Sequence, residues 1–196
     1  MARPREFNED EALLQATRLF WSKGYEGTSM ADLLRATGLS KSSLYDTFGS
    51  KRDLFLAAFE AYRVERIRTM RGYLQSGPTA YAAIAAFFRM VLKHARAEDR
   101  PFGCMSCNEA AEMAPHDEEI QKLIERDFDG MENAFAEAIA RGHADGSISA
   151  SHDAGQYARF LNATHHGLQI MARTRSQIDR MDDVLTVTLR ALKGES

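Results

Sequence analysis

Apolar residues recur at three- and four-residue spacing along most of the chain, the spacing that places them on one face of an α-helix. The first such segment begins after Asn8 and ends at Gly24, and a longer one runs from Lys51 to about Leu74. Further segments cover residues 79–98, 104–113, 117–141, 153–174 and 178–192. No stretch alternates convincingly between apolar and polar residues, as a strand would. Together with two short helices between residues 28 and 48, this pattern predicts an all-α fold of about nine helices.

The two short helices have the pattern of a helix-turn-helix. Thr28 is expected to cap the first helix, since its hydroxyl can accept a backbone N–H of the first turn. Gly38 ends that helix, because glycine adopts the left-handed conformation at no steric cost. Ser40 is expected to cap the second helix. The apolar side of the second helix is formed by Leu44, Tyr45 and Phe48. Two short helices around a tight glycine turn are typical of DNA-reading proteins, whose second helix lies in the major groove.

The polar face of the second helix consists of residue types that bind phosphates and base edges. Ser50 is expected to cap the following helix, whose first turn carries the cations Lys51 and Arg52 beside free N–H groups, a suitable place for a phosphate. The predicted DNA contacts are Thr28, Lys41, Ser42, Ser43, Tyr45, Thr47 and Lys51. The alternative is a helical interaction module without DNA function, in which residues 41–47 are only a solvated surface.

These residues resemble the DNA-binding domain of the TetR family of bacterial transcriptional repressors. The resemblance rests on TSMADLLRATGLSKSSLYDTFGSK at residues 28–51, preceded by A-x-x-L-F-x-x-K-G-Y-E-G, and covers roughly residues 8–60. It implies that Thr28 and Lys51 hold phosphates from helix N-termini. It further implies that Lys41 to Ser43 and Thr47 reach base edges or backbone, and that Tyr45 reaches the backbone.

The chain departs from the family pattern at three positions of the second helix. Family members often carry glycine and threonine where this chain has Ser42 and Ser43, and histidine where it has Asp46. The carboxylate of Asp46 adds a negative charge close to the duplex and could accept a hydrogen bond from a cytosine amino group.

The resemblance also implies a division into two domains. Residues 1–50 form the DNA-binding domain and residues 51–196 a helical ligand-binding and dimerisation domain, with the helix from Lys51 shared between them. One recognition helix reads one half-site, so a homodimer is expected to supply the second. The last two helices are the predicted interface, packing as a four-helix bundle with their partners. The interface residues are Gln156, Phe160, Thr164, Gly167, Leu168 and Met171 in one helix, and Leu185, Val187, Leu189 and Leu192 in the other.

The larger domain is expected to hold a pocket for a small-molecule inducer of unknown identity. Pockets of helical proteins form between helices and are mostly apolar. The candidates by position are Phe87, Phe88, Met90, Phe102, Cys104, Met105, Phe128, Met131, His165 and Met171. The alternative for each of these side chains is an ordinary place in the core.

Two cysteines stand out within the larger domain. The segment around Phe102-Gly103-Cys104 is similar to a branch of the TetR family that includes electrophile- and redox-responsive repressors. Cys104 is predicted near a helix N-terminus with Arg100 four residues before it, which favours a reactive thiolate. Cys107 lies one turn further on and could resolve a sulfenic acid as a disulfide. The alternative is that both cysteines are small buried apolar residues.

Composition limits the other function classes. The 196 residues are 44% hydrophobic and 27% charged, as in a globular protein, and no apolar run approaches the roughly 18 residues of a membrane helix. The N-terminus lacks the apolar core of a signal peptide, so a cytoplasmic location without membrane attachment is expected. Residues 1–71 hold 12 basic against 10 acidic side chains, whereas the whole chain has a net charge of −3. No catalytic signature is present, and we expect neither an enzyme nor a cofactor. A single Cys-x-x-Cys offers too few ligands for structural zinc.

Overall fold

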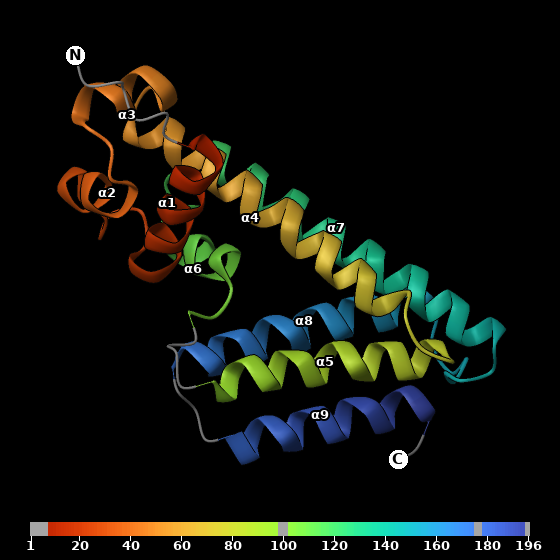
Figure 1. Cartoon of the computed structure of the whole chain (residues 1–196). Coiled ribbons are helices and arrows are strands. Elements are labelled where there is room, and N and C mark those ends of the chain that lie inside the picture. The colour runs from red at the N-terminus through yellow and green to blue at the C-terminus, as the bar shows by residue number, and fades with distance from the viewer. Residues whose placement is uncertain (1–7, 98–101, 175–177, 195–196) are drawn as a thin grey trace. The chain divides into compact units, whose positions relative to one another are not determined.

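The computed structural model describes residues 8–97, 102–174 and 178–194, and within these ranges it contains nine α-helices and no strand (Figure 1). The helices are α1 (Glu9–Lys23), α2 (Met30–Thr37), α3 (Lys41–Phe48), α4 (Lys51–Leu74), α5 (Ala80–Arg96), α6 (Met105–Glu112), α7 (Glu118–Ala144), α8 (Ala154–Arg173) and α9 (Ile178–Lys193). The predicted all-α fold of nine helices is confirmed for the described part of the chain.

The chain forms two compact units, Met1–Glu65 and Arg66–Ser196, which divide within α4. This division lies beyond the predicted boundary after residue 50. The reason is that the first half of α4 completes the core of the N-terminal unit. Phe55 of α4 makes an edge contact with Phe20 of α1 at 5.2 Å between ring centroids, and with Tyr25 at 5.0 Å. The N-terminal unit therefore depends on α4 for part of its core.

Side-chain caps define the ends of the helix-turn-helix. Ser29, and not Thr28, is the N-cap of α2: its hydroxyl accepts the Asp32 N–H at 3.1 Å, while the Asp32 carboxylate accepts the Ser29 N–H. The predicted capping role of Thr28 is wrong. Gly38 ends α2 at φ 70°, in the left-handed region, as expected. Ser40 caps α3 as predicted by accepting the Ser43 N–H.

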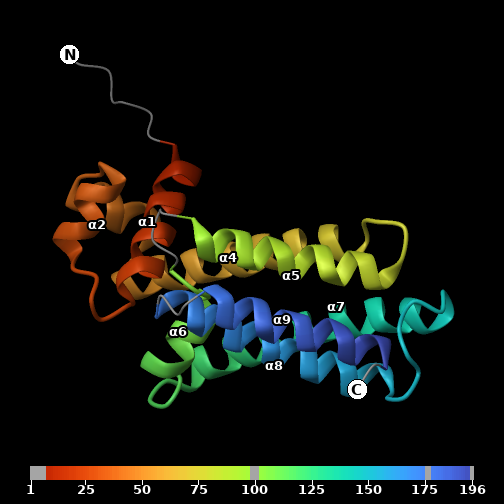
Figure 2. The same cartoon turned by 90° about the horizontal axis from the view of Figure 1, so that it is seen from below.

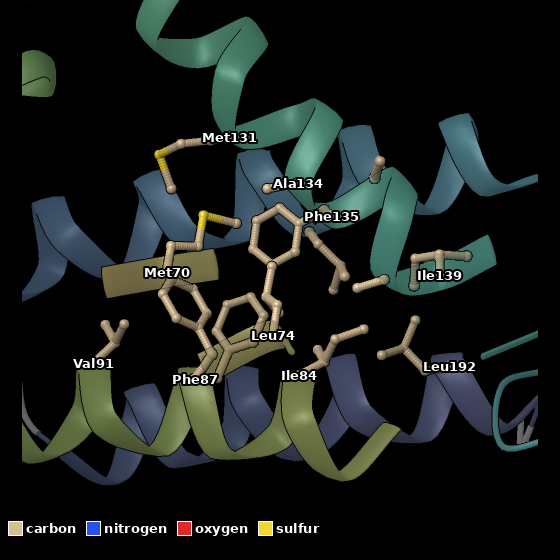
Figure 3. Close-up of a cluster of buried hydrophobic side chains, with 14 of the residues drawn as sticks. Met70, Leu74, Ile84, Phe87, Val91, Met131, Ala134, Phe135, Ile139 and Leu192 are labelled. Atoms are coloured by element: carbon tan, nitrogen blue, oxygen red, sulfur yellow. The ribbon is translucent and has the colours of Figure 1, made fainter. Parts of the chain in front are cut away.

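Aromatic side chains of α5 and α7 form part of the core of the C-terminal unit, which also contains residues of α4, α8 and α9. The rings of Phe88 and Phe135 stack at 5.8 Å, and Phe87 meets Phe135 edge to face at 5.7 Å. Figure 3 shows Phe87, Met131 and Phe135 directed into the same cluster. A core of interlocked rings at this spacing holds α5 and α7 at one fixed separation.

Helices α5, α8 and α9 run alongside one another and are mutually packed (Figures 1 and 2). Three residues assigned from the sequence to the dimer interface are instead buried in the core of the C-terminal unit: Leu168, Leu185 and Leu192. The large apolar side chains that remain exposed on α8 and α9 are Phe160, Ile170, Val184 and Val187.

Candidate DNA-binding surface and cysteine site

The N-terminus of α3 presents a cluster of hydroxyl groups. The Ser40 Oγ lies 3.0 Å from the Ser42 Oγ and 2.8 Å from the Ser43 Oγ. Lys41, Ser42 and Tyr45 are exposed, and the Lys41 Nζ lies 6.0 Å from the centroid of the Tyr45 ring. Hydroxyls, a cation and free N–H groups at one helix end form a surface suited to phosphate oxygens.

Thr47 is half-buried in the last turn of α3, and the other two predicted contacts, Lys51 and Thr28, lie in different environments. The Lys51 Nζ lies 4.2 Å from the centroid of the Tyr25 ring, a cation–π contact that holds the ammonium at the start of α4. Thr28 is fully buried, and its hydroxyl donates to the Gly24 carbonyl at 2.7 Å. The hydroxyl predicted to meet a phosphate therefore faces the interior of the N-terminal unit.

A second cluster of polar groups surrounds Cys104 in the C-terminal unit. Cys104 is the N-cap of α6, with extended backbone at φ −103°. Gly103 before it adopts φ 69°, and a Cβ there would meet the Gln169 carbonyl oxygen of α8 at 2.8 Å, so only glycine lets the chain enter α6 here. The predicted position of Cys104 at a helix start is confirmed. Arg100, the predicted source of positive charge, lies outside the described residues.

A different arginine meets the Cys104 sulfur. The Arg66 Nη1 of α4 donates to the Cys104 Sγ, and the Arg66 Nη2 donates to the Asp127 carboxylate of α7. The Ser106 hydroxyl donates to the same carboxylate oxygen at 2.6 Å. A cation therefore faces the sulfur from within the protein, the environment that favours a thiolate.

The thiol of Cys107 hydrogen-bonds to the sulfur of Cys104. Cys107 lies one turn further along α6, and its thiol hydrogen-bonds to Cys104, which together with burial raises the pKa of the Cys107 thiol. The two cysteines are not joined by a disulfide. The proton thus stays on Cys107, and the sulfur of Cys104 receives hydrogen bonds from both Cys107 and Arg66.

Uncharged titratable groups line the helices around this site. Burial raises the pKa of Glu109 to about 8, with Glu112 adding a like charge, and the two Glu109 oxygens have no hydrogen-bond partner among the residues described. Burial lowers the pKa of His166 to about 4 and that of His165 well below its usual value. The ring of His166 packs against Phe128 at 4.1 Å between centroids. The two histidines therefore add no positive charge beside Arg66.

The predicted ligand residues lie in three parts of the C-terminal unit. Phe87, Phe88 and Met131 are closed into the core, with Met90 and Met171 packed against it. Phe102, Cys104 and Met105 lie at the start of α6, whereas Phe128 and His165 come from α7 and α8. An open hollow of ≈ 550 Å³ is lined by Ser151, His152, Gln156, Tyr157, Phe160, Ala191 and Gly194, which include none of the ten.

The sequence reasoning missed Arg66, Ser106, Glu109 and Asp127. Asp127 had a detectable signal, because it follows Ile124 by three residues and precedes Met131 by four, so it occupies an apolar position of α7. A charged residue on the buried face of a helix implies a partner of opposite charge. Arg66 had no such signal, since it lies among other arginines of α4.

A helix-turn-helix carrying a polar recognition helix, followed by a separate helical unit, defines a DNA-binding transcriptional regulator. The family model for bacterial regulatory proteins of the tetR family matches residues 12–58. The model for the tetracyclin repressor-like C-terminal domain matches residues 80–188. The chain belongs to the TetR family. The family resemblance proposed from the sequence is therefore confirmed, and the alternative of an interaction module without DNA function is not.

Three similar proteins extend over nearly the whole chain. The uncharacterized regulator YezE of Bacillus subtilis (strain 168) is 34% identical over 98% of this chain and 100% of its own. The repressor ComR of Escherichia coli (strain K12) is 30% identical over 96% of this chain and 90% of its own. A CifR variant with substituted cysteines, solved with 26-bp operator DNA, is 32% identical with a TM-score of 0.86, covering 97% of this chain and 100% of its own. These relatives are transcriptional regulators rather than enzymes. None of the helices described here has the length and apolar character to cross a membrane.

Proposed function

We propose that this chain acts in the cytoplasm as a homodimeric repressor that binds double-stranded operator DNA and leaves it when Cys104 is oxidised. The observation that carries the proposal is the pair of hydrogen bonds received by the Cys104 sulfur, one from the Arg66 guanidinium and one from the Cys107 thiol. A Cys104 thiolate held in this way would be the nucleophile that attacks the oxidant, and its negative charge would be lost when the sulfur is oxidised.

The DNA contacts are assigned to the exposed end of α3 and to the start of α4. Lys41, Ser42, Ser43, Tyr45 and Thr47 reach base edges or backbone, and Lys51 holds a phosphate. Thr28 is left out of the set, because its hydroxyl is buried and donates to Gly24. Asp46 is exposed on the same helix, where it could accept a hydrogen bond from a cytosine amino group.

The dimer is assigned to the exposed apolar faces of α8 and α9. Phe160 on α8 and Val187 on α9 are exposed, although both belong to helices whose other faces pack into the core. A second copy placed against them would bury both faces in a four-helix bundle. Sedimentation should then give about twice the 22.0 kDa of one chain, and Phe160→Glu should shift the protein towards that single-chain mass. A wild-type monomer at micromolar concentration would contradict the assignment.

The burial of Cys104 limits the size of the oxidant that can reach its sulfur. Only 1% of Cys104 is exposed, whereas Cys107 is half-buried, so a small peroxide suits the site better than a bulky quinone. The Cys104 thiolate attacks one peroxide oxygen and the O–O bond breaks, which gives a sulfenic acid, and the hydroxide that leaves takes a proton from solvent to become water. Cys107 then attacks that sulfur, and the sulfenic oxygen leaves as a second water. Two thiols are oxidised to a disulfide while one hydrogen peroxide is reduced to two waters.

The test compares operator affinity before and after oxidation. An operator duplex is selected from a random pool by the reduced protein, and its affinity is measured for wild type, Cys104→Ser and Cys107→Ser with and without hydrogen peroxide. Wild type should lose affinity and regain it with dithiothreitol, while Cys104→Ser should bind equally in both conditions. If wild type keeps its affinity after mass spectrometry shows the disulfide, the inducer is instead a reversibly bound small molecule.

A further inference from the structure

One arginine joins the cysteine site to the helix that the two units share. Arg66 lies on α4, its side chain is only 13% exposed, and it pairs with the fully buried carboxylate of Asp127 on α7. Its other terminal nitrogen donates to the Cys104 Sγ at the start of α6. The planar guanidinium can face two acceptors at once, which a lysine ammonium on a flexible chain cannot do with the same geometry.

Arg66 occupies a particular place along α4. The helix is continuous from Lys51 to Leu74, and the two compact units divide between Glu65 and Arg66. Arg66 is therefore the first residue of the C-terminal unit on a helix whose earlier turns belong to the DNA-binding unit. A displacement of the Arg66 turn necessarily acts on the same helix that begins at Lys51.

We propose that Arg66 is the positioning residue that transmits the state of Cys104 to α4, an inference that rests on the proposed function. In the reduced protein the guanidinium is held by a sulfur and a carboxylate from two different helices. Disulfide formation removes the negative charge of the sulfur and most of its strength as an acceptor. The pair of Arg66 with Asp127 remains, whereas its contact with the start of α6 is lost.

Two other arginines of α4, Arg63 and Arg71, pair with different residues. Arg63 pairs with Glu60 of its own helix, at 3.0 Å. Arg71 reaches Glu137 of α7 at 3.3 Å, but that pair is about half exposed on both sides and involves no residue of α6. Arg71 therefore offers a matched control, since its replacement also removes a cation that joins α4 to α7.

The experiment uses the full-length protein as wild type, Arg66→Gln, Arg66→Lys and Arg71→Gln. Each is kept reduced, or treated with hydrogen peroxide until mass spectrometry shows complete Cys104–Cys107 disulfide. Affinity for the selected operator duplex is then measured in both states. Driving the disulfide to completion separates transmission of the signal from the rate at which the thiol reacts, and circular dichroism checks that each variant is folded.

Wild type and Arg71→Gln should lose about tenfold in affinity on oxidation, the size of one charge-assisted hydrogen bond. Arg66→Gln should bind equally in the two states, at the level of the oxidised wild type, because the bridge is absent in both. Arg66→Lys keeps the charge but cannot face both acceptors in the same geometry, so its ratio of reduced to oxidised affinity should be smaller than that of wild type. This variant still tests the inference if Arg66→Gln does not fold. A wild-type ratio in folded, fully oxidised Arg66→Gln or Arg66→Lys would overturn the inference. A wild type that forms the disulfide without losing affinity would overturn the proposed function itself.

Discussion

The buried carboxylate of Asp127 on α7 accepts a hydrogen bond from the guanidinium of Arg66 on α4. The Ser106 hydroxyl of α6 donates a hydrogen bond to the same carboxylate oxygen, at 2.6 Å. Three helices therefore meet at one charged group inside the C-terminal unit. Removing one partner of such a pair leaves the other charge buried, which costs far more than the pair itself contributes. This asymmetry leads to the first prediction.

Asp127→Asn should destabilise the protein by about 3 kcal/mol, because it removes the buried carboxylate charge that faces the Arg66 guanidinium. Urea unfolding monitored by circular dichroism measures the loss. Glu137→Gln is the control: it breaks the exposed pair with Arg71 and should cost less than about 1 kcal/mol. Equal costs for the two substitutions would mean that the Arg66–Asp127 pair is not buried in solution.

Glu109 should make stability depend on pH. Its folded pKa of about 8 exceeds the ordinary value of 4.5, so the folded state holds the proton more tightly than the unfolded state does. As pH rises from 4.5 to 8, the folded form therefore loses stability relative to the unfolded form. Glu109→Gln removes this loss and should be more stable than wild type at pH 9, by up to about 4 kcal/mol.

The Glu109→Gln advantage should shrink as the pH falls towards 5, where the wild-type carboxyl is protonated in the folded protein. Urea unfolding at pH 5, 7 and 9 follows this change. Glu125→Gln, at an exposed position of α7, should show no such trend. An advantage of constant size across this range would mean that Glu109 is not titrating there.

Two glycine substitutions should have opposite effects on stability. Gly38 has φ 70° with open space around its Cα, so Gly38→Ala meets no clash but places alanine in the left-handed region, at a cost of about 1 kcal/mol. Gly72 lies in α4, with open space and no positive φ, so Gly72→Ala should stabilise by about 0.5 kcal/mol through helix propensity. Thermal unfolding of both variants measures the signs, and a gain from Gly38→Ala would show that the α2–α3 turn differs in solution.

Lys51→Ala should weaken binding to all DNA sequences by a similar factor, since a phosphate contact carries no sequence information. The slope of log affinity against log salt should fall in magnitude by about one. Lys93→Ala removes an exposed cation of α5 in the C-terminal unit and should leave the slope unchanged. Fluorescence anisotropy at several salt concentrations measures both slopes. An unchanged slope in Lys51→Ala would remove Lys51 from the DNA contacts.

The helix-turn-helix was predictable because its signals are local. Gly38 can take the left-handed conformation that ends α2, and Ser40 can cap α3, without reference to distant parts of the chain. The N-cap of α2 was misplaced by one residue for a related reason. Thr28 and Ser29 are both good caps, and only the burial of the Thr28 side chain against Gly24 decides between them.

The interior positions were harder to assign. Phe160 and Leu168 share the spacing of one α8 face, yet Phe160 is exposed whereas Leu168 is fully buried. Helical periodicity identifies an apolar stripe but not which neighbour covers each part of it. The same limit placed Phe88 and Met131 in a predicted pocket, although their side chains complete the core.

By itself, the sequence determined the helices, the helix-turn-helix and the position of Cys104 at the start of α6, because each depends on residues within one or two turns. The tertiary structure alone decided what faces the Cys104 sulfur. Arg66 is 38 residues away in the chain and Asp127 is 61 residues from Arg66, so no local pattern relates them. The contact between these residues depends on how α4, α6 and α7 pack. That packing is set by apolar contacts, which do not depend on which charged side chains they bring together.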